Sequence, residues 1–135
     1  MTIKAINHIA IVTGDIDNAL AFWRDALGLE LAHRAHVKAE AVDTAHLPIG
    51  DADIELIQPT DDASGVARYL AKRGASIHHL CIEVDDIAAT LERLTAHGVQ
   101  LINETPRTGE GGKLYAFVHP KSAGGVMVEL YQLPS

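Results

Sequence analysis

A chain of 135 residues is long enough to bury one core and too short for two large independent ones, so we expect a single domain over residues 1–135. The apolar fraction of 47% is ordinary for a globular protein, and no apolar run is long enough to cross a bilayer, which argues against a membrane partner. The formal net charge of −7, without a dense cluster of Lys or Arg, argues against nucleic acid as a partner. The single cysteine, Cys81, excludes an internal disulfide, and the first residues lack a signal-peptide pattern, so we expect a cytoplasmic protein.

The first half of the chain alternates strand and helix patterns. We predict a strand over about Ala5–Val12, then a helix that is capped by Asp15 and stopped by Gly28. An extended stretch begins after this helix at residues 29–31, and two more strands are expected at about Glu40–Leu47 and Asp53–Gln58.

The second half repeats this plan after a linking helix predicted over about residues 62–73. The sequence therefore predicts an α+β fold made of two β-α-β-β-β modules, at about residues 4–59 and 75–133. The equivalent pairs are His8/His79, Ile16/Ile87, Leu20/Leu91 and Trp23/Leu94 at an offset of 71, and Ile54–Gln58 with Val128–Gln132 at an offset of 74.

One imidazole and one carboxylate recur in each module: His8 with Glu55, and His79 with Glu129. If the two modules pair their sheets into one cleft, these four side chains form a set that suits a divalent ion such as Co, Mn, Ni, Fe or Zn. A lone carboxylate among apolar strand residues is costly unless it is paired or bound to metal. Taken singly, each residue is more often structural, and a strand Glu can simply face solvent; the symmetry of the quartet favours the metal interpretation.

Other polar residues carry weaker signals. His78 points to the face of the strand opposite His79, so both cannot bind one ion from a regular strand. Arg107, Lys113 and Lys121 flank two Gly-rich loops and are candidate contacts for an anionic ligand, although such loops are more often plain hairpin turns. The remaining histidines are interpreted as structural: His33, His36, His46, His97 and His119.

The paired modules with their His…Glu…His…Glu pattern resemble the vicinal oxygen chelate superfamily, and within it the chain is most similar to the methylmalonyl-CoA epimerases. The resemblance covers almost the whole chain. Its distinctive segments are Ile6–Ala10, Ala67–Gly74, Ile77–Leu80, Val84–Ile87, Gly98–Ile102, Glu104–Arg107, Phe117–Ser122 and Gly125–Leu130.

The resemblance implies an open, cleft-bearing, barrel-like sheet with one metal ion held by His8, Glu55, His79 and Glu129. The resemblance also implies the reaction of these epimerases, which is interconversion of (R)- and (S)-methylmalonyl-CoA by a 1,1-proton transfer through a metal-stabilised enolate. Homodimers are common in the superfamily, so a homodimer that binds an acyl-CoA is expected.

Two acid–base groups are needed to move a proton between opposite faces of one carbon. Glu129 matches the glutamate credited with this role in the family. Some members carry the second Glu where this chain has Thr44, together with Gln at the position of Glu55. We therefore expect Glu55 to be the second acid–base group, with Asp43 as the alternative if the local register differs by one residue.

Three other functions occur in the superfamily and are alternatives for this chain. A glyoxalase I-type lactoylglutathione lyase would use the same quartet, and a non-catalytic small-molecule binder would commonly lack the full ligand set. A ring-cleaving dioxygenase would keep only a His-His-Glu triad for iron.

Overall fold

The computed structural model describes residues 1–135 and confirms the α+β class. The chain divides into two units: residues 8–78 form one, and residues 1–7 with 79–135 form the other. The helices and strands are β1 (Ile3–Val12), α1 (Ile16–Leu20), β2 (His33–Val37), β3 (Val42–Ile49), β4 (Ala52–Pro59), α2 (Gly65–Arg73), β5 (Ser76–Val84), α3 (Ile87–Ala96), β6 (Arg107–Thr108), β7 (Leu114–Val118) and β8 (Val128–Gln132).

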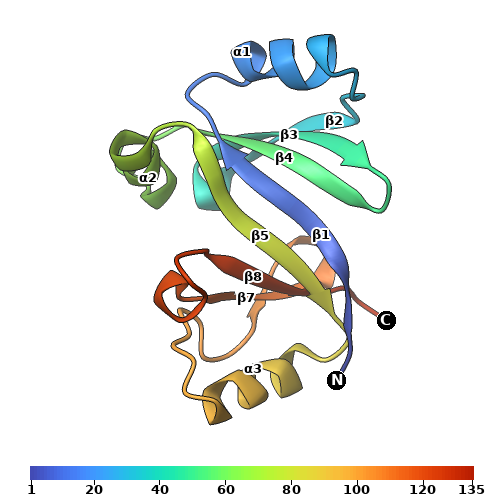
Figure 1. Cartoon of the computed structure of the whole chain (residues 1–135), viewed down its shortest axis with the longest axis vertical. Helices are drawn as coiled ribbons and strands as arrows, with labels where there is room; N and C mark the ends of the chain where they lie inside the picture. Colours follow the sequence, from blue (N-terminus) through green and yellow to red (C-terminus); the bar gives the residue numbers. More distant parts are fainter. The chain divides into compact units, whose positions relative to one another are not determined.

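The unit of residues 8–78 is a sheet with the strand order β2-β3-β4-β1, in which β1 and β4 are parallel and the other pairs antiparallel. Helix α1 covers one face (Figure 1). Its Leu20 packs there with Leu47 and Leu56. Helix α2 covers part of the other face, against Ala10, Val12 and Ile57. Both faces of this sheet are therefore covered at least in part by a helix.

The unit of residues 1–7 and 79–135 has the strand order β5-β8-β7-β6, with β5 and β8 parallel. Helix α3 packs Ile87 and Leu91 onto one face of this sheet (Figure 1). The first residues of the chain are fixed to the end of β5, because the backbone N–H of Thr2 donates to the Asp85 carboxylate at 2.6 Å.

The two units share the details that begin their first helices. Asp15 and Asp86 are the N-caps of α1 and α3, and each accepts a hydrogen bond from the backbone three residues later. A strand glutamine supplies a second acceptor in each unit: Gln58 Oε1 accepts from the N–H of Ile16, and Gln132 Oε1 accepts from the N–H of Ile87. The predicted internal repeat is thus present in capping as well as in strand order.

Several boundaries differ from the sequence prediction. The strand after the first helix begins at His33 rather than near residue 29, and it is an exposed edge strand without apolar alternation. The next strand begins at Val42, because Lys38–Glu40 forms a 3₁₀ turn and Ala41 adopts a left-handed backbone with φ of 53°. The first helix continues beyond Leu20 as a π-helical turn over Ala21–Ala26.

The two Gly-rich segments are turns. Gly109–Gly112 connects the antiparallel strands β6 and β7 through a 3₁₀ turn, and Gly111 and Gly112 have positive φ there. Pro120–Ser122 forms another 3₁₀ turn just before the second Gly-rich segment. The backbone N–H of Lys121 in this turn donates to His119 Nδ1. His119 therefore has a structural role. No helix of the chain combines the length and the apolar character needed to span a membrane.

Candidate functional site

In the unit that contains α3, His79 and Glu129 lie on neighbouring parallel strands. The register pairs Cys81 with Glu129, which places His79, Cys81 and Glu129 on one face of the sheet, opposite α3. His79 Nε2 is 3.1 Å from Glu129 Oε1, and both side chains are about nine-tenths buried. The rings of Phe117 and His79 also meet edge to face, at 5.7 Å between centroids and 88° between planes.

In the unit of residues 8–78, His8 and Glu55 occupy the corresponding strands. The register pairs Ala10 with Glu55, so His8 and Glu55 share the face on which α2 packs. His8 Nε2 is 3.5 Å from Glu55 Oε2. His8 is buried, while the Glu55 side chain is 17% exposed.

Each unit thus brings together one of the two predicted His–Glu pairs. Neighbouring ligands of a first-row ion, each about 2.1 Å from the metal, lie about 3 Å apart. The separations of 3.1 and 3.5 Å suit both a hydrogen-bonded pair and two adjacent ligands of one ion. His8, His79 and Glu129 are buried and belong to types that bind such an ion, so the donor set fits a divalent metal. That all four residues share one ion stays a prediction.

The structure distinguishes His79 from His78 and Glu55 from Asp43. His78 contacts the Tyr69 ring of α2 at 4.7 Å between centroids, whereas His79 contacts Glu129. Asp43 pairs with Gln58 across the strands, lies on the face opposite Glu55, and holds His36 Nδ1 at 2.9 Å. The register shift that would make Asp43 the second acid–base group is therefore not the one adopted.

His46 is a neighbour of Glu55 that the sequence interpretation treated as structural. The two residues lie directly opposite each other on β3 and β4, and His46 Nδ1 is 4.0 Å from Glu55 Oε2. Burial lowers the pKa of His46, and the nearby Glu55 carboxylate partly offsets this effect. The position in the other unit that corresponds to His46 is Phe117, which lies across the strands from Glu129. Because this counterpart is not a histidine, the internal alignment gave no reason to select His46.

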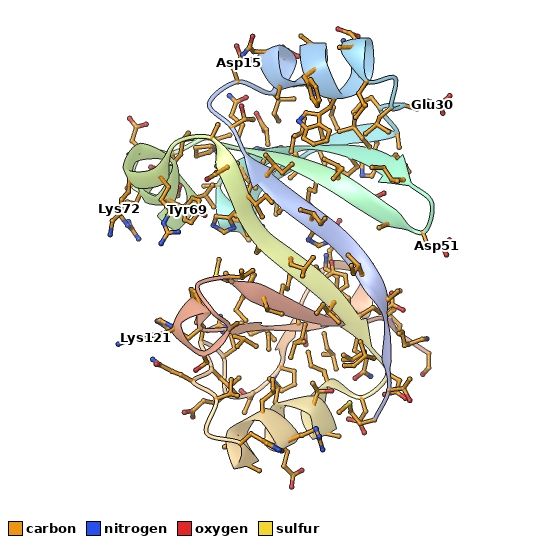
Figure 2. All side chains as sticks on the ribbon, viewed as in Figure 1. Asp15, Glu30, Asp51, Tyr69, Lys72 and Lys121 are labelled. Atoms are coloured by element: carbon orange, nitrogen blue, oxygen red, sulfur yellow. The ribbon has the colours of Figure 1, made fainter.

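The predicted anion contacts are scattered over one unit. Lys121 is exposed on the turn before β8 (Figure 2). Arg107 is exposed on β6, and Lys113 Nζ lies 4.8 Å from the centre of the Tyr131 ring. Helix α2 carries three further cations without an acidic residue, and Arg73 lies over the ring of Tyr69. The cations of α2 were not selected from the sequence, although their concentration in an acidic chain was visible there.

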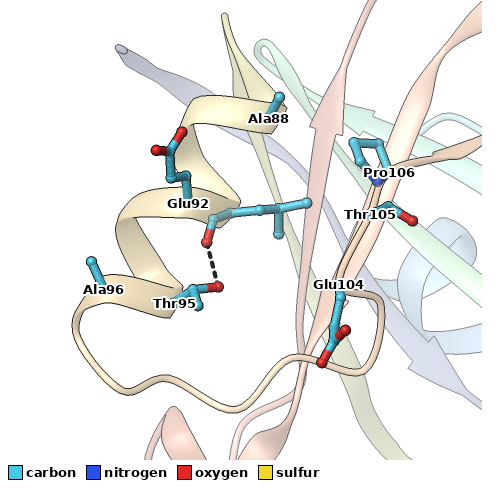
Figure 3. Close-up of a pocket in the computed structure, with 8 residues that line it drawn as sticks. Ala88, Glu92, Thr95, Ala96, Glu104, Thr105 and Pro106 are labelled. Carbon is cyan, nitrogen blue, oxygen red and sulfur yellow. Dashed lines mark hydrogen bonds between the residues drawn. The ribbon is translucent and has the colours of Figure 1, made fainter.

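A surface groove runs between α3 and the segment that precedes β6 (Figure 3). It contains no histidine and neither of the paired glutamates, so it is separate from the His79–Glu129 pair. Its lining residues are Ala88, Leu91, Glu92, Thr95, Ala96, Glu104, Thr105 and Pro106.

Comparison with known proteins identifies the family. The Glyoxalase/Bleomycin resistance protein/Dioxygenase superfamily matches residues 7–117. The chain belongs to this superfamily, also called the vicinal oxygen chelate superfamily, and the predicted fold is confirmed.

Within the superfamily, several of the similar proteins are epimerases, and others are uncharacterized. The ethylmalonyl-CoA/methylmalonyl-CoA epimerase of Cereibacter sphaeroides is 35% identical over 133 residues, which cover 97% of this chain and 99% of that protein. The crystal structure of methylmalonyl-CoA epimerase from Mycobacterium tuberculosis is 35% identical with a TM-score of 0.87, over 98% of this chain and 90% of that one. A methylmalonyl-CoA epimerase in complex with methylmalonyl-CoA and ammonium is 31% identical with a TM-score of 0.89, over 99% of this chain and 97% of that one.

Proposed function

We propose that this protein is a metal-dependent epimerase that interconverts (R)- and (S)-methylmalonyl-CoA. The observation that carries the proposal is the presence of a His–Glu pair on the first and last strands of each repeat, at 3.1 and 3.5 Å. The relatives described above support the choice of reaction, because they are epimerases matched over almost their whole length.

His8, Glu55, His79 and Glu129 would hold one divalent ion. When bound, that ion would supply a Lewis acid that stabilises the negative charge left when the proton leaves the substrate. This donor set admits several first-row metals. In an ion that takes six ligands, these four residues would leave two positions for substrate oxygens.

Glu55 and Glu129 would carry out the proton transfers from opposite sides of C2. One carboxylate takes the C2 proton while the electrons of the C–H bond move into the thioester. The other glutamate, which starts protonated, delivers its proton to the opposite face of C2. After one turnover the two glutamates have exchanged protonation states, and exchange of one proton each with water, or catalysis of the reverse reaction, restores the starting state. The substrate gains and loses one proton and no electrons, so no oxidant or reductant is required.

The substrate would be an acyl-CoA, and its phosphates would need cations. Arg107, Lys113 and Lys121 are the proposed contacts in one unit, and α2 offers further cations in the other. A pocket discriminates weakly between methyl and ethyl groups, since one methylene is worth about 1–3 kcal/mol. A cytoplasmic homodimer is part of the same proposal.

Exchange of the C2 proton tests the proposed function. The metal-loaded protein is incubated with (S)-methylmalonyl-CoA in deuterium oxide, and deuterium uptake and optical rotation are followed together. We expect deuterium incorporation with loss of optical activity, and we expect a chelator to abolish both.

The absence of exchange with metal bound would overturn the epimerase proposal. Conversion of methylglyoxal and glutathione by the same preparation would then assign the lactoylglutathione lyase reaction. Binding of small molecules without either turnover would assign a non-catalytic member of the superfamily.

A further inference from the structure

Four titratable side chains form a row across the sheet of residues 8–78. The row runs over neighbouring strands, from His33 on β2 to His46 on β3, Glu55 on β4 and His8 on β1. The register pairs His33 with His46, and His46 with Glu55. All four side chains lie on the face opposite α1, so the proposed acid–base group Glu55 has an imidazole on each side.

His46 is held in this row by contacts on several sides. Its ring stacks on that of His33, with 4.2 Å between centroids and 11° between planes. Its Nδ1 lies 3.8 Å from Asp53 Oδ2 and 4.0 Å from Glu55 Oε2. Its Nε2 lies 3.1 Å from the hydroxyl oxygen of Thr44, a buried residue two positions earlier on the same strand. The ring therefore has little freedom to turn.

The chemistry of these neighbours selects one tautomer of the ring. Asp53 and Glu55 face Nδ1 at 3.8 and 4.0 Å, which is beyond hydrogen-bond distance, and the negative charge of the two carboxylates favours hydrogen on that nitrogen. In the neutral ring Nε2 then has the lone pair and accepts a hydrogen bond from the Thr44 hydroxyl. The Thr44 hydroxyl thus fixes one side of the imidazole by a hydrogen bond, while the other side faces the two carboxylates at charge-contact distance.

We propose that His46, oriented by Thr44 and stacked on His33, is the positioning residue for Glu55. Its Nδ1–H lies between two carboxylates that project from the same face of β4 at residues 53 and 55. It separates their charges and keeps the Glu55 carboxylate directed towards His8. This inference rests on the proposed role of Glu55. His46 would act as a neighbour that orients a metal ligand or a catalytic carboxylate.

The tautomer can be measured without any variant. Nitrogen-15 NMR of the imidazole rings, at a pH at which His46 is neutral, should show hydrogen on Nδ1 of His46 in the wild-type protein. Thr44→Val removes the hydroxyl donor with little change of shape, and we expect a mixture of tautomers in that variant. Hydrogen on Nε2 in the wild-type protein would overturn the proposal.

A matched pair of substitutions tests the effect on Glu55. His46→Asn keeps an N–H near the position of Nδ1, whereas His46→Leu has a similar size and no donor. Loss of a supporting contact next to a metal ligand typically costs 10–100-fold in affinity or activity, so we expect His46→Leu to weaken metal binding about tenfold. At saturating metal we also expect a fall of about tenfold in kcat with little change in KM, and His46→Asn should recover most of both losses.

His36 provides the control, because it pairs with Asp43 on the same two strands but on the opposite face. His36→Leu should change neither metal affinity nor kcat. Wild-type metal affinity in His46→Leu, or equal losses in His46→Leu and His46→Asn, would overturn the positioning role. If the protein has no epimerase activity, the proposed function fails, while the tautomer and the metal affinity still decide this inference.

Discussion

The two His–Glu pairs occupy equivalent strands and have different surroundings. Glu129 is about nine-tenths buried, shares its face with Cys81, and lies directly across the strands from Phe117. Glu55 is more exposed and has His46 and Asp53 on the same face. The comparison indicates that the repeat preserved the fold and the imidazole–carboxylate pair, while the neighbours of the two carboxylates diverged. In our account this divergence gives the two glutamates separate duties on the two faces of one carbon.

Removal of either glutamate should have the largest effect. Glu55→Gln and Glu129→Gln should each lower the rate of epimerisation by about 10²–10⁴-fold, because each removes one of two proton-transfer groups. Each variant should still exchange the C2 proton of one enantiomer with deuterium, since the remaining glutamate serves one face. The rates are measured by optical rotation and the exchange by mass spectrometry, at saturating metal.

The two variants should prefer opposite enantiomers in the exchange assay. Near-normal epimerisation by Glu55→Gln would show that Glu55 is not the second acid–base group. The same enantiomer exchanged by both variants would contradict the assignment of the glutamates to opposite faces.

Truncation of the buried leucine on the first helix of each unit should destabilise the two units by similar amounts. Leu20 and Leu91 are equivalent in the repeat and both are buried, at 1% and 3% exposure. Leu20→Ala and Leu91→Ala should each lower the free energy of unfolding by about 2–5 kcal/mol in urea denaturation. Leu27→Ala is the control, because that side chain is exposed and the change should stay within about 0.5 kcal/mol. A loss below 1 kcal/mol in only one of the buried variants would show that the units do not pack equivalently.

The glutamine caps should have a smaller and equal effect. Gln58→Leu and Gln132→Leu each leave a helix N–H without its acceptor, and each should cost about 1–2 kcal/mol of unfolding free energy. Gln58→Glu and Gln132→Glu keep an acceptor oxygen and add a negative charge at a helix N-terminus, so they should lose less. Thermal denaturation of the four variants checks this order, and a Leu variant as stable as its Glu counterpart would contradict it.

Asp85 has no equivalent contact in the other unit and should have the smallest effect. The hydrogen bond from the Thr2 backbone N–H lowers the pKa of Asp85 in the folded protein. A carboxylate with a lowered folded pKa contributes stability above its unfolded pKa, and this contribution disappears as the pH falls through the folded pKa. Asp85→Asn should therefore lower the urea midpoint slightly near neutral pH and leave it unchanged in acid. An equal difference at both pH values would contradict the electrostatic origin.

Much of the fold could be predicted because each half of the sequence repeats its pattern. Apolar spacing predicted the first helix, its repetition in the second half predicted the other, and Asp15 predicted where the first one begins. The edge strand β2 was placed wrongly, because its exposed residues need no apolar alternation. The π-helical turn after Leu20 leaves no signature in residue spacing that separates it from an α-helix.

The candidate site could be predicted only where the repeat marked it. His8 and His79 were selected by their equivalent positions, and strand alternation separated His79 from His78. His46 and Thr44 were missed as neighbours of Glu55, because their relation to it depends on the pairing register of β3 and β4. Turns and core packing together set this register. A shift of one residue would have placed Asp43, instead of Thr44, on the sheet face that carries Glu55.

The central claim is that the two His–Glu pairs hold one ion. The most direct test is the metal content and affinity of the wild-type protein, His8→Ala and His79→Ala, measured by elemental analysis and by calorimetry on metal-free protein. We expect one ion per wild-type chain, and at least about a 100-fold loss of affinity in each variant, since each lacks a direct ligand of the same ion. Two ions per chain, or one ion held with wild-type affinity after the loss of either histidine, would contradict a shared metal centre.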